Sequence, residues 1–314
     1  MGTVIEITLV GDNEEAANKA AFRAFQEMKR IEQLMSPKIE FGDVFRINQF
    51  SGKEWVRVSP ETIQVIKKAQ EISELSEGGF DITVGPLTEL WRKARERKAP
   101  PSEEEVKEKL DLVNFKNIEM DKEGKVFLKK KGMAIDLGGI AKGYAVDRAF
   151  DSCRSAGIED FLIDLSGNIR VSGRPQWGED WQIGVRDPFD RSHIIGKVTL
   201  RSGMALATSG NYERFVEMGG QRYSHIINPK TGYPVTGTAG VTILAEDATT
   251  ADGWSTSFFV AGLKGADKFR QKAPSVNVLF VPDKYPTEIW VTPGFAKVFA
   301  PLPEFSKAVK VLYP

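Results

Sequence analysis

Three oxygen-bearing side chains lie close together in the run Asp252-Gly-Trp-Ser-Thr256. If the run is helical, Asp252 and Thr256 are four residues apart and face the same side, with Ser255 adjacent. One carboxylate, one hydroxyl and a backbone carbonyl from elsewhere form an oxygen set suited to Mg²⁺, which usually keeps waters and phosphates as its other ligands. The same spacing also fits an ordinary amphipathic helix that buries Trp254 and Phe258.

A glycine-rich turn lies in the run Asp136-Leu-Gly-Gly-Ile-Ala-Lys142-Gly. The pattern predicts an apolar strand that ends at Asp136 and a helix that follows the turn. A glycine turn at a helix N-terminus suits a phosphate, and it lets a backbone carbonyl approach a metal. Lys142 can neutralise a phosphate oxygen, and Asp136 can accept from a ligand donor. The spacing matches neither Walker A nor G-x-G-x-x-G, so a tight structural turn is the alternative.

His225 is one of two histidines and follows a short predicted strand, before an Asn-Pro and Thr-Gly turn. A histidine in such a place can act as a general base near neutral pH. A single histidine is more often structural, and His193 has only that interpretation. Cys153 lies on the apolar face of a predicted helix, which favours a buried, unreactive thiol.

These residues need a framework, and the apolar periodicity indicates an α+β fold with mixed or antiparallel sheets and packed helices. Asp247 is a typical N-cap for a helix that starts near Ala248. The regular repeat of a doubly wound sheet is missing. Glycine turns in both halves are the pattern of an internal duplication, although the identity between the halves is too low to define one. Helices are expected over residues 14–35, 59–76, 141–156 and 248–263, and strands over 4–10, 117–120, 126–130, 161–164, 182–185, 197–200 and 242–245.

Composition narrows the class of protein. The 314 residues carry 43 basic and 43 acidic side chains, a balance that argues against a nucleic-acid-binding protein or one that coats anionic membranes. One cysteine excludes a disulfide framework and a cysteine-based zinc site. No run reaches the roughly 20 apolar residues of a membrane span. We expect one domain over residues 1–314, with two closely packed lobes as the alternative.

Several segments in fixed order resemble the FAD:protein FMN transferases, the ApbE-like flavin transferases. The resemblance runs from Met1 to about Gly262 and implies a T-fold-like architecture. The matching segments are Leu34-Met-Ser36 with Arg46 and Asn48, Gly79-Phe-Asp-Ile-Thr-Val-Gly-Pro-Leu87, Asp136-Leu-Gly-Gly-Ile-Ala-Lys-Gly-Tyr-Ala145, Leu206-Ala-Thr-Ser-Gly210, Tyr223-Ser-His-Ile-Ile-Asn-Pro-Lys-Thr-Gly-Tyr-Pro234, and Ala251-Asp252 with Thr256.

The resemblance implies a reaction and its participants. FAD would be split at its pyrophosphate with Mg²⁺, FMN would pass to a Thr or Ser hydroxyl of an acceptor flavoprotein, and AMP would leave. The metal would be held by Asp252, Thr256 and the backbone carbonyl of Gly139. Ser255 stands where some members carry a second acidic ligand. His225 would deprotonate the acceptor hydroxyl.

The resemblance also implies the flavin contacts, and two departures concern them. Lys38 stands where the family often has an aromatic residue, and the run Ile163-Asp-Leu-Ser-Gly-Asn168 replaces a more usual Gly-Gly-Asp. Neither departure touches the expected metal ligands. The residues expected to contact the flavin are Met1, Gly79, Phe80, Asp81, Asp136, Lys142 and Ile226.

Two other functions fit the same residues. A metal-dependent FAD pyrophosphatase would use water instead of a protein hydroxyl, and a flavin-binding protein would keep FAD intact. Because members of the family in bacteria are commonly exported lipoproteins, we expect a periplasmic or membrane-anchored protein whose signal is not part of this chain. A cytoplasmic location is the alternative.

Overall fold

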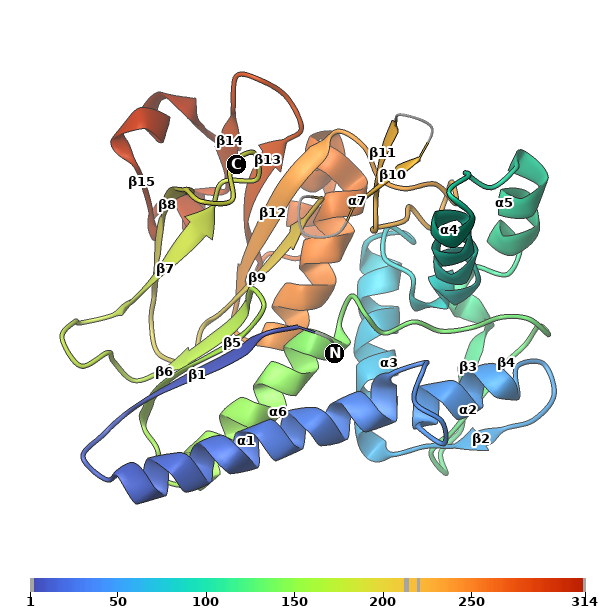
Figure 1. Cartoon of the computed structure of the whole chain (residues 1–314), viewed down its shortest axis with the longest axis horizontal. Coiled ribbons are helices and arrows are strands. Elements are labelled where there is room, and N and C mark those ends of the chain that lie inside the picture. The colour runs from blue at the N-terminus through green and yellow to red at the C-terminus, as the bar shows by residue number, and fades with distance from the viewer. Residues whose placement is uncertain (1–2, 212–214, 219–220, 313–314) are drawn as a thin grey trace. The chain divides into compact units, whose positions relative to one another are not determined.

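Residues 3–211, 215–218 and 221–312 are described by a computed structural model of the chain (Figure 1). The predicted α+β class is confirmed, since helices accompany antiparallel and mixed sheets. Met1, an expected flavin contact, lies outside the described residues. Two contact-dense units are built from interleaved segments of the chain. Unit 1 comprises Met1–Ile31, Lys142–Gly210 and Gly237–Pro314, and unit 2 comprises Glu32–Ala141 and Asn211–Thr236.

Unit 1 is built on an eight-stranded sheet in the order β1-β5-β6-β9-β12-β13-β14-β16. Neighbouring strands are antiparallel except for the parallel pair β14 and β16. The strands are β1 (Ile5–Val10), β5 (Asp160–Leu165), β6 (Asn168–Ser172), β9 (Ala205–Gly210), β12 (Thr238–Ala245), β13 (Asn277–Pro282), β14 (Ile289–Val291) and β16 (Val309–Val311).

A second sheet of unit 1 packs against one face of the first. Its strands are β7 (Trp181–Arg186), β8 (Ile194–Leu200) and β15 (Phe299–Pro301), in the order β15-β8-β7. Residues of β7 alternate between buried and exposed, as expected for a strand with one face on a core. The shared core includes Ile183, Val198, Leu206, Leu244 and Leu279.

Helix α7 (Ala248–Lys272) of unit 1, which carries Asp252 and Thr256, packs against the large sheet. It lies along β9 and β12 (Figure 1). All eight residues of β12 are buried, which explains its nearly continuous apolar sequence. The backbone of α7 breaks at Gly262, where φ is 65°, close to the predicted helix end at residue 263. The other helices are α1 (Glu14–Met35), α6 (Ala141–Ser155), α8 (Pro293–Ala296) and the 3₁₀ helix η3 (Pro303–Ala308).

Unit 2 contains helices and short strands around buried apolar residues. Its helices begin at recognisable caps, since the side chains of Ser59 and Ser102 accept from backbone amides of the first turns of α3 and α5. Leu87, Leu90 and Trp91 of α4 form the centre of its apolar cluster. The helices are α2 (Asp43–Gln49), α3 (Pro60–Leu75), η1 (Ile82–Val84), α4 (Gly85–Arg97), α5 (Glu103–Leu110) and η2 (Phe115–Asn117). The strands are β2 (Val56–Arg57), β3 (Ile118–Met120), β4 (Lys125–Leu128), β10 (Phe215–Met218) and β11 (Gln221–Ser224).

The predicted strand before Asp136 is wrong. Residues 133–137 have no regular secondary structure, because their polar backbone groups bond outside a ladder. The side chain of Asn48 donates to the Ile135 carbonyl (2.9 Å) and accepts from the Ile135 N–H (2.7 Å). The Asp136 N–H donates to the carbonyl of Ile82 (2.7 Å). An asparagine side chain thus replaces the partner strand that the apolar sequence suggested.

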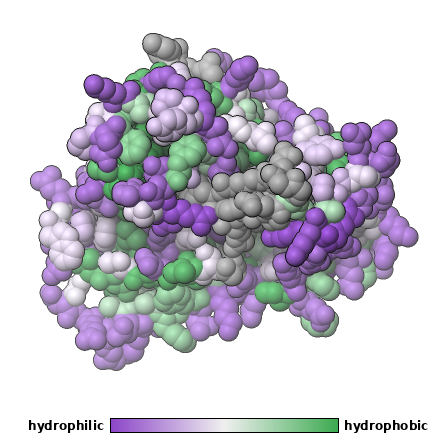
Figure 2. All heavy atoms as spheres, turned by 45° about the horizontal axis from the view of Figure 1, so that its top comes forward, coloured by the Kyte–Doolittle hydropathy of each residue, from purple (hydrophilic) through white to green (hydrophobic). Residues whose placement is uncertain are grey.

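Hydrophilic residues cover most of the face shown in Figure 2, with hydrophobic residues in separate small areas. The most exposed large apolar side chains include Tyr285, Trp177 and Phe41, which come from distant parts of the sequence. Scattered exposed apolar residues are normal on protein surfaces. Within the described ranges, none of the helices combines the length and apolar character that a membrane span requires.

Candidate active site

The site in unit 1 begins with the close approach of helices α6 and α7. A Cβ atom added to Gly143 would lie 2.1 Å from the carbonyl oxygen of Ala248 and 2.8 Å from the Cβ of Asp252. Only glycine therefore lets the first turns of the two helices meet at this distance. The glycine that follows Lys142 in the sequence is thus required by helix packing.

Asp252 uses this approach to reach the N-terminus of α6. Its side chain is 3% exposed, and its Oδ2 accepts from the N–H of Gly143 (2.9 Å). Gly143 is the third residue of α6, so its N–H has no partner within the helix. The positive end of the helix dipole adds to this stabilisation of the carboxylate. The Nζ of Lys142 donates to Oδ1 of the same carboxylate (3.1 Å).

Asn168 completes what we term the Asp252 cluster, which consists of Lys142, Asn168 and Asp252. Asn168 is fully buried at the start of β6. With its amide oriented to satisfy both partners, Nδ2 donates to Asp252 Oδ1 (3.0 Å) and the amide oxygen accepts from Lys142 Nζ (2.6 Å). The sequence placed Asn168 only in a segment that departs from the family pattern. A polar residue at the start of an apolar strand is the signal that could have marked it.

Ser255 and Thr256 occupy different surroundings on α7. The Ser255 hydroxyl donates to the backbone carbonyl of Asp252 (2.8 Å) and hydrogen-bonds with Ser209 on β9 (2.8 Å). Ser255 is fully buried against the sheet, whereas Thr256 is half-buried. The expected metal ligands Asp252 and Thr256 therefore share a side of α7, and Ser255 points its hydroxyl to β9. Both hydroxyls remain predicted ligands.

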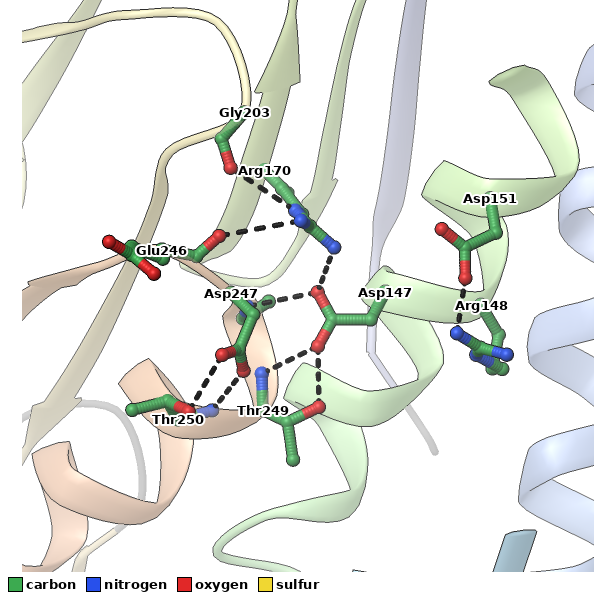
Figure 3. A network of polar contacts seen from close by, with 10 residues as sticks. Asp147, Arg148, Asp151, Arg170, Gly203, Glu246, Asp247, Thr249 and Thr250 are labelled. Atoms are coloured by element: carbon green, nitrogen blue, oxygen red, sulfur yellow. Dashed lines mark hydrogen bonds and ion pairs between the residues drawn. The ribbon is translucent and has the colours of Figure 1, made fainter. Parts of the chain in front are cut away.

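A second carboxylate mirrors the role of Asp252. Asp147 lies on α6, and its two oxygens accept from the N–H groups of Ala248 and Thr249 (both 2.9 Å) at the start of α7 (Figure 3). Asp147 follows Gly143 by four residues, as Asp252 follows Ala248. Each helix therefore supplies a carboxylate to first-turn N–H groups of the other, in addition to Asp247, which caps α7 from its own chain end. We term this arrangement the reciprocal cap.

Arg170 secures the Asp147 half of the reciprocal cap. Its guanidinium donates to Asp147 Oδ1 (2.9 Å) and to the carbonyls of Glu246 and Gly203 (both 3.3 Å) (Figure 3). It also lies 4.1 Å from the centre of the Phe150 ring. Arg170 is two residues beyond Asn168 on β6, so both residues face the helices. One strand thus contacts both capping carboxylates. Asp147 and Arg170 lacked a local sequence signal because 23 residues separate them.

The expected flavin-contact segment of unit 2 is a tightly bonded turn. Gly79, Phe80 and Asp81 are buried. Asp81 caps the short helix η1: its Oδ1 accepts from the N–H of Thr83 (2.8 Å) and its Oδ2 from the N–H of Phe115 (2.9 Å). Burial raises the pKa of the Asp81 carboxyl, and these hydrogen bonds oppose the rise. These hydrogen bonds fix the segment within unit 2.

Asp136 lies beside that segment, joined through the bond from its N–H to the Ile82 carbonyl (2.7 Å). Its Oδ1 accepts from the Gly138 N–H (2.8 Å). Loss of surrounding water raises the pKa of the Asp136 carboxyl, and the charge of Lys38 opposes this. Gly139 follows within the turn that the Ile140 N–H closes on the Leu137 carbonyl (3.0 Å). Unit 2 thus brings several expected flavin contacts together.

His225 is exposed and lies directly after β11. The next residue, Ile226, is buried, and its carbonyl accepts from the N–H of Val235 (2.9 Å). The indole of Trp91 donates to the Gly232 carbonyl (2.8 Å). These bonds anchor the loop that begins at His225 to the core of unit 2. The backbone that carries the imidazole is therefore held in place.

Cys153 and His193 lie outside the Asp252 cluster and the reciprocal cap. Cys153 is fully buried, as predicted, and burial raises the pKa of its thiol to about 11, which favours the protonated, unreactive form. His193 is on the surface, where its Nδ1 lies 2.8 Å from Asp190 Oδ2.

Over the described ranges, no three His, Cys, Asp or Glu side chains group as a metal centre. A metal at Asp252 would therefore need hydroxyl, carbonyl or water ligands.

Known proteins match almost the whole chain. The ApbE family model matches residues 1–280. A FAD:protein FMN transferase of Klebsiella pneumoniae (strain 342) is 34% identical over 285 residues, which cover 90% of this chain and 86% of that protein. A FAD:protein FMN transferase of Treponema pallidum is 30% identical over 302 residues, with coverage of 90% and 83%.

Two solved structures share the fold. The ApbE protein from Thermotoga maritima superimposes with a TM-score of 0.87 at 38% identity and covers 95% of this chain and 96% of its own. The flavin transferase ApbE from Vibrio cholerae gives a TM-score of 0.83 at 28% identity, with the same coverage. With a family model matched over 280 residues and relatives above 30% identity, this chain belongs to the ApbE family.

Proposed function

We propose that this protein transfers FMN from FAD to a Thr or Ser hydroxyl of an acceptor flavoprotein, with Mg²⁺ bound at Asp252. Its relatives from Klebsiella and Treponema carry the name FAD:protein FMN transferase. The observation that carries the proposal is the Asp252 cluster at the N-terminus of α6. It combines a buried carboxylate, a lysine and a helix dipole, which are the groups that metal-assisted pyrophosphate cleavage uses.

The donor set at Asp252 fits a divalent cation. The carboxylate is almost fully buried, so it needs a positive partner, a role that the Lys142 ammonium, 3.1 Å from Oδ1, fills in this structure. Thr256, one turn further along α7, would add a hydroxyl, and the Gly139 carbonyl would add a third oxygen. These are the hard oxygen ligands that Mg²⁺ prefers. A bound Mg²⁺ would neutralise charge on the pyrophosphate oxygens.

The residues of this chain have distinct tasks in the proposed reaction. Lys142 and the N-terminus of α6 stabilise negative charge on the phosphate groups. Gly79, Phe80, Asp81 and Asp136 hold the flavin. His225 accepts the proton of the acceptor hydroxyl, whose oxygen then attacks the phosphorus of the FMN half. The new oxygen–phosphorus bond forms as the bond to AMP breaks, and AMP leaves with the bridging oxygen.

Covalent flavin on an acceptor is the direct test. The protein is incubated with FAD, Mg²⁺ and the flavin-carrying domain of a candidate flavoprotein. The proteins are then separated on a denaturing gel, and flavin fluorescence is measured on the acceptor band. We expect fluorescence on the acceptor, and none when its target threonine is replaced by valine. Free FMN with an unlabelled acceptor would indicate a pyrophosphatase. Intact FAD after prolonged incubation would indicate a binding protein.

His225→Gln tests the proposed base. Loss of the base should lower the transfer rate about 10²- to 10⁴-fold while the affinity for FAD changes by less than about threefold. Transfer is followed by acceptor fluorescence and FAD affinity by calorimetry. His193→Gln, at the surface histidine, serves as the matched control. A large loss of FAD affinity in His225→Gln would instead make His225 a binding residue.

A further inference from the structure

The two halves of the reciprocal cap differ in how their carboxylates are held. Asp147 is paired with Arg170, whose guanidinium also donates to two backbone carbonyls and lies against the Phe150 ring. Asp252 is paired with Lys142 through a single ammonium, and the Lys142 side chain is 32% exposed, against 17% for Arg170. The Arg170 guanidinium is thus fixed by several partners. The Lys142 ammonium has fewer partners and is more exposed to solvent.

The oxygen Oδ1 of Asp252 has little room for another cation. It accepts from Lys142 Nζ (3.1 Å) and from Asn168 Nδ2 (3.0 Å), while Oδ2 accepts from the Gly143 N–H (2.9 Å). Two positive charges at one buried oxygen repel each other strongly in a medium of low dielectric constant. A divalent cation that binds to Oδ1 must therefore replace the lysine.

We propose that Lys142 is an exchangeable counter-ion of Asp252: it neutralises the carboxylate in the metal-free protein and leaves when a divalent cation binds. The exchange replaces one ion pair by another and transfers no proton. The inference rests on the proposed function, because it assumes a metal at Asp252, and it adds an order to that function. The metal binds first, and only then is the lysine free for the pyrophosphate.

Asn168 keeps the released lysine within reach. Its amide oxygen accepts from Lys142 Nζ at 2.6 Å, and because the residue is fully buried in β6 it does not move with the ligand. After exchange, the ammonium retains this bond and turns its remaining donors to an incoming phosphate oxygen. Lys142 is therefore the counter-ion of Asp252 before metal binding and a phosphate contact after it.

Metal affinity measured without FAD separates this role from ordinary catalysis. In calorimetric titrations with Mg²⁺ alone, we expect Lys142→Met to bind about five- to tenfold more tightly than the parent, because a partly exposed ion pair no longer competes. Lys142→Gln, which can still donate to Asp252, guards against misfolding and should shift in the same direction. Lys142→Arg should bind no more tightly than the parent. Lys197→Met, at an exposed lysine of β8, is the matched control.

The release of FMN from FAD gives the second readout. We expect Lys142→Met and Lys142→Gln to split FAD at least about tenfold more slowly despite their tighter hold on Mg²⁺. Equal or weaker Mg²⁺ binding by both variants, with normal binding by the parent, would overturn the counter-ion role and leave the proposed function intact. No Mg²⁺ binding by the parent, with metal-independent FAD cleavage, would overturn both.

Discussion

Asp147 and Asp252 show how one residue type takes two roles. Both are buried aspartates that cap a neighbouring helix. Asp147 is saturated by donors that belong to the fold, among them Arg170, so its role is structural. Asp252 shares its charge with Lys142, a partner that can be replaced. The surroundings of the carboxylate, rather than the carboxylate itself, make Asp252 the candidate metal ligand.

Asp252→Asn removes the charge and keeps the shape. The amide oxygen can still accept from Gly143, so we expect the free energy of unfolding to change by less than about 2 kcal/mol. Mg²⁺ affinity and FAD cleavage should each fall at least about 100-fold, because the neutral amide lacks the negative charge that attracts the cation. Calorimetry and FMN release measure the two effects. Parent-like turnover would rule out a metal at Asp252.

Asp136 provides a prediction on pH. Its folded-state pKa is raised, chiefly by loss of surrounding water, so the folded protein prefers the protonated carboxyl. The contribution of this group to stability is present below its unfolded pKa and is lost as the pH rises through the higher folded pKa. Asp136→Asn should therefore gain stability relative to the parent as the pH rises above the unfolded pKa of an aspartate, about 3.9.

Urea unfolding at several pH values checks this expectation for Asp136. Asp12→Asn, at an exposed aspartate, is the control and should track the parent at each pH. A constant difference between Asp136→Asn and the parent over the whole range would contradict the raised pKa.

At the scale of elements, helices α6 and α7 act as one body. Their first turns meet at Gly143 and Ala248. The Gly143 N–H of α6 donates to Asp252 of α7, and the Ala248 and Thr249 N–H groups of α7 donate to Asp147 of α6. Strand β6 contacts both carboxylates through Asn168 and Arg170. The position of Asp252 is therefore set by three elements, so a change in helix spacing should disturb the cluster.

Gly143→Ala tests this dependence. The added methyl would overlap the Ala248 carbonyl at 2.1 Å, so α6 and α7 must separate. We expect a loss of about 1–3 kcal/mol of unfolding free energy together with weaker Mg²⁺ binding. Gly11→Ala, where an added Cβ meets nothing within 4 Å, is the control. Unchanged stability and metal affinity in Gly143→Ala would show that the spacing is not critical.

At the scale of the whole molecule, two units are assembled from interleaved segments of the chain. The proposed metal ligands Asp252 and Thr256 belong to unit 1, and the expected flavin contacts Gly79 to Asp81 and Asp136 belong to unit 2. The formal net charge of zero offers no overall electrostatic attraction for an acceptor of either sign. Recognition of the acceptor must therefore depend on local surface features.

Metal removal should inactivate the protein without unfolding it. Excess EDTA should reduce FAD cleavage to background, and excess Mg²⁺ should restore it, because the proposed reaction uses the cation. The fold should persist because Lys142 still compensates Asp252, so the circular dichroism spectrum should be unchanged. FAD cleavage that persists in EDTA would contradict a metal-dependent mechanism.

Local signals in the sequence predicted α1, α3, α6 and the first part of α7. Ser59, Ser102 and Asp247 act as N-caps in the structure as their residue types suggest, because capping depends on residues three or fewer apart. The prediction of a strand before Asp136 was wrong because it depended on a partner that is distant in the sequence. The apolar residues there indicated a ladder, but the partner of their backbone is the side chain of Asn48, 87 residues away.

The sequence by itself indicated the α+β class and the family, and it singled out Asp252, Lys142 and His225 as candidate site residues. These inferences depend on short-range patterns and on segments in fixed order. Only the tertiary structure decided how the acidic residues are used. It joined Asn168 to Asp252 and Lys142, and paired Asp147 with Arg170, across separations that carry no local signal. The physical reason is helix packing: the missing Cβ of Gly143 lets two helix N-termini meet, and each then needs a carboxylate from the other.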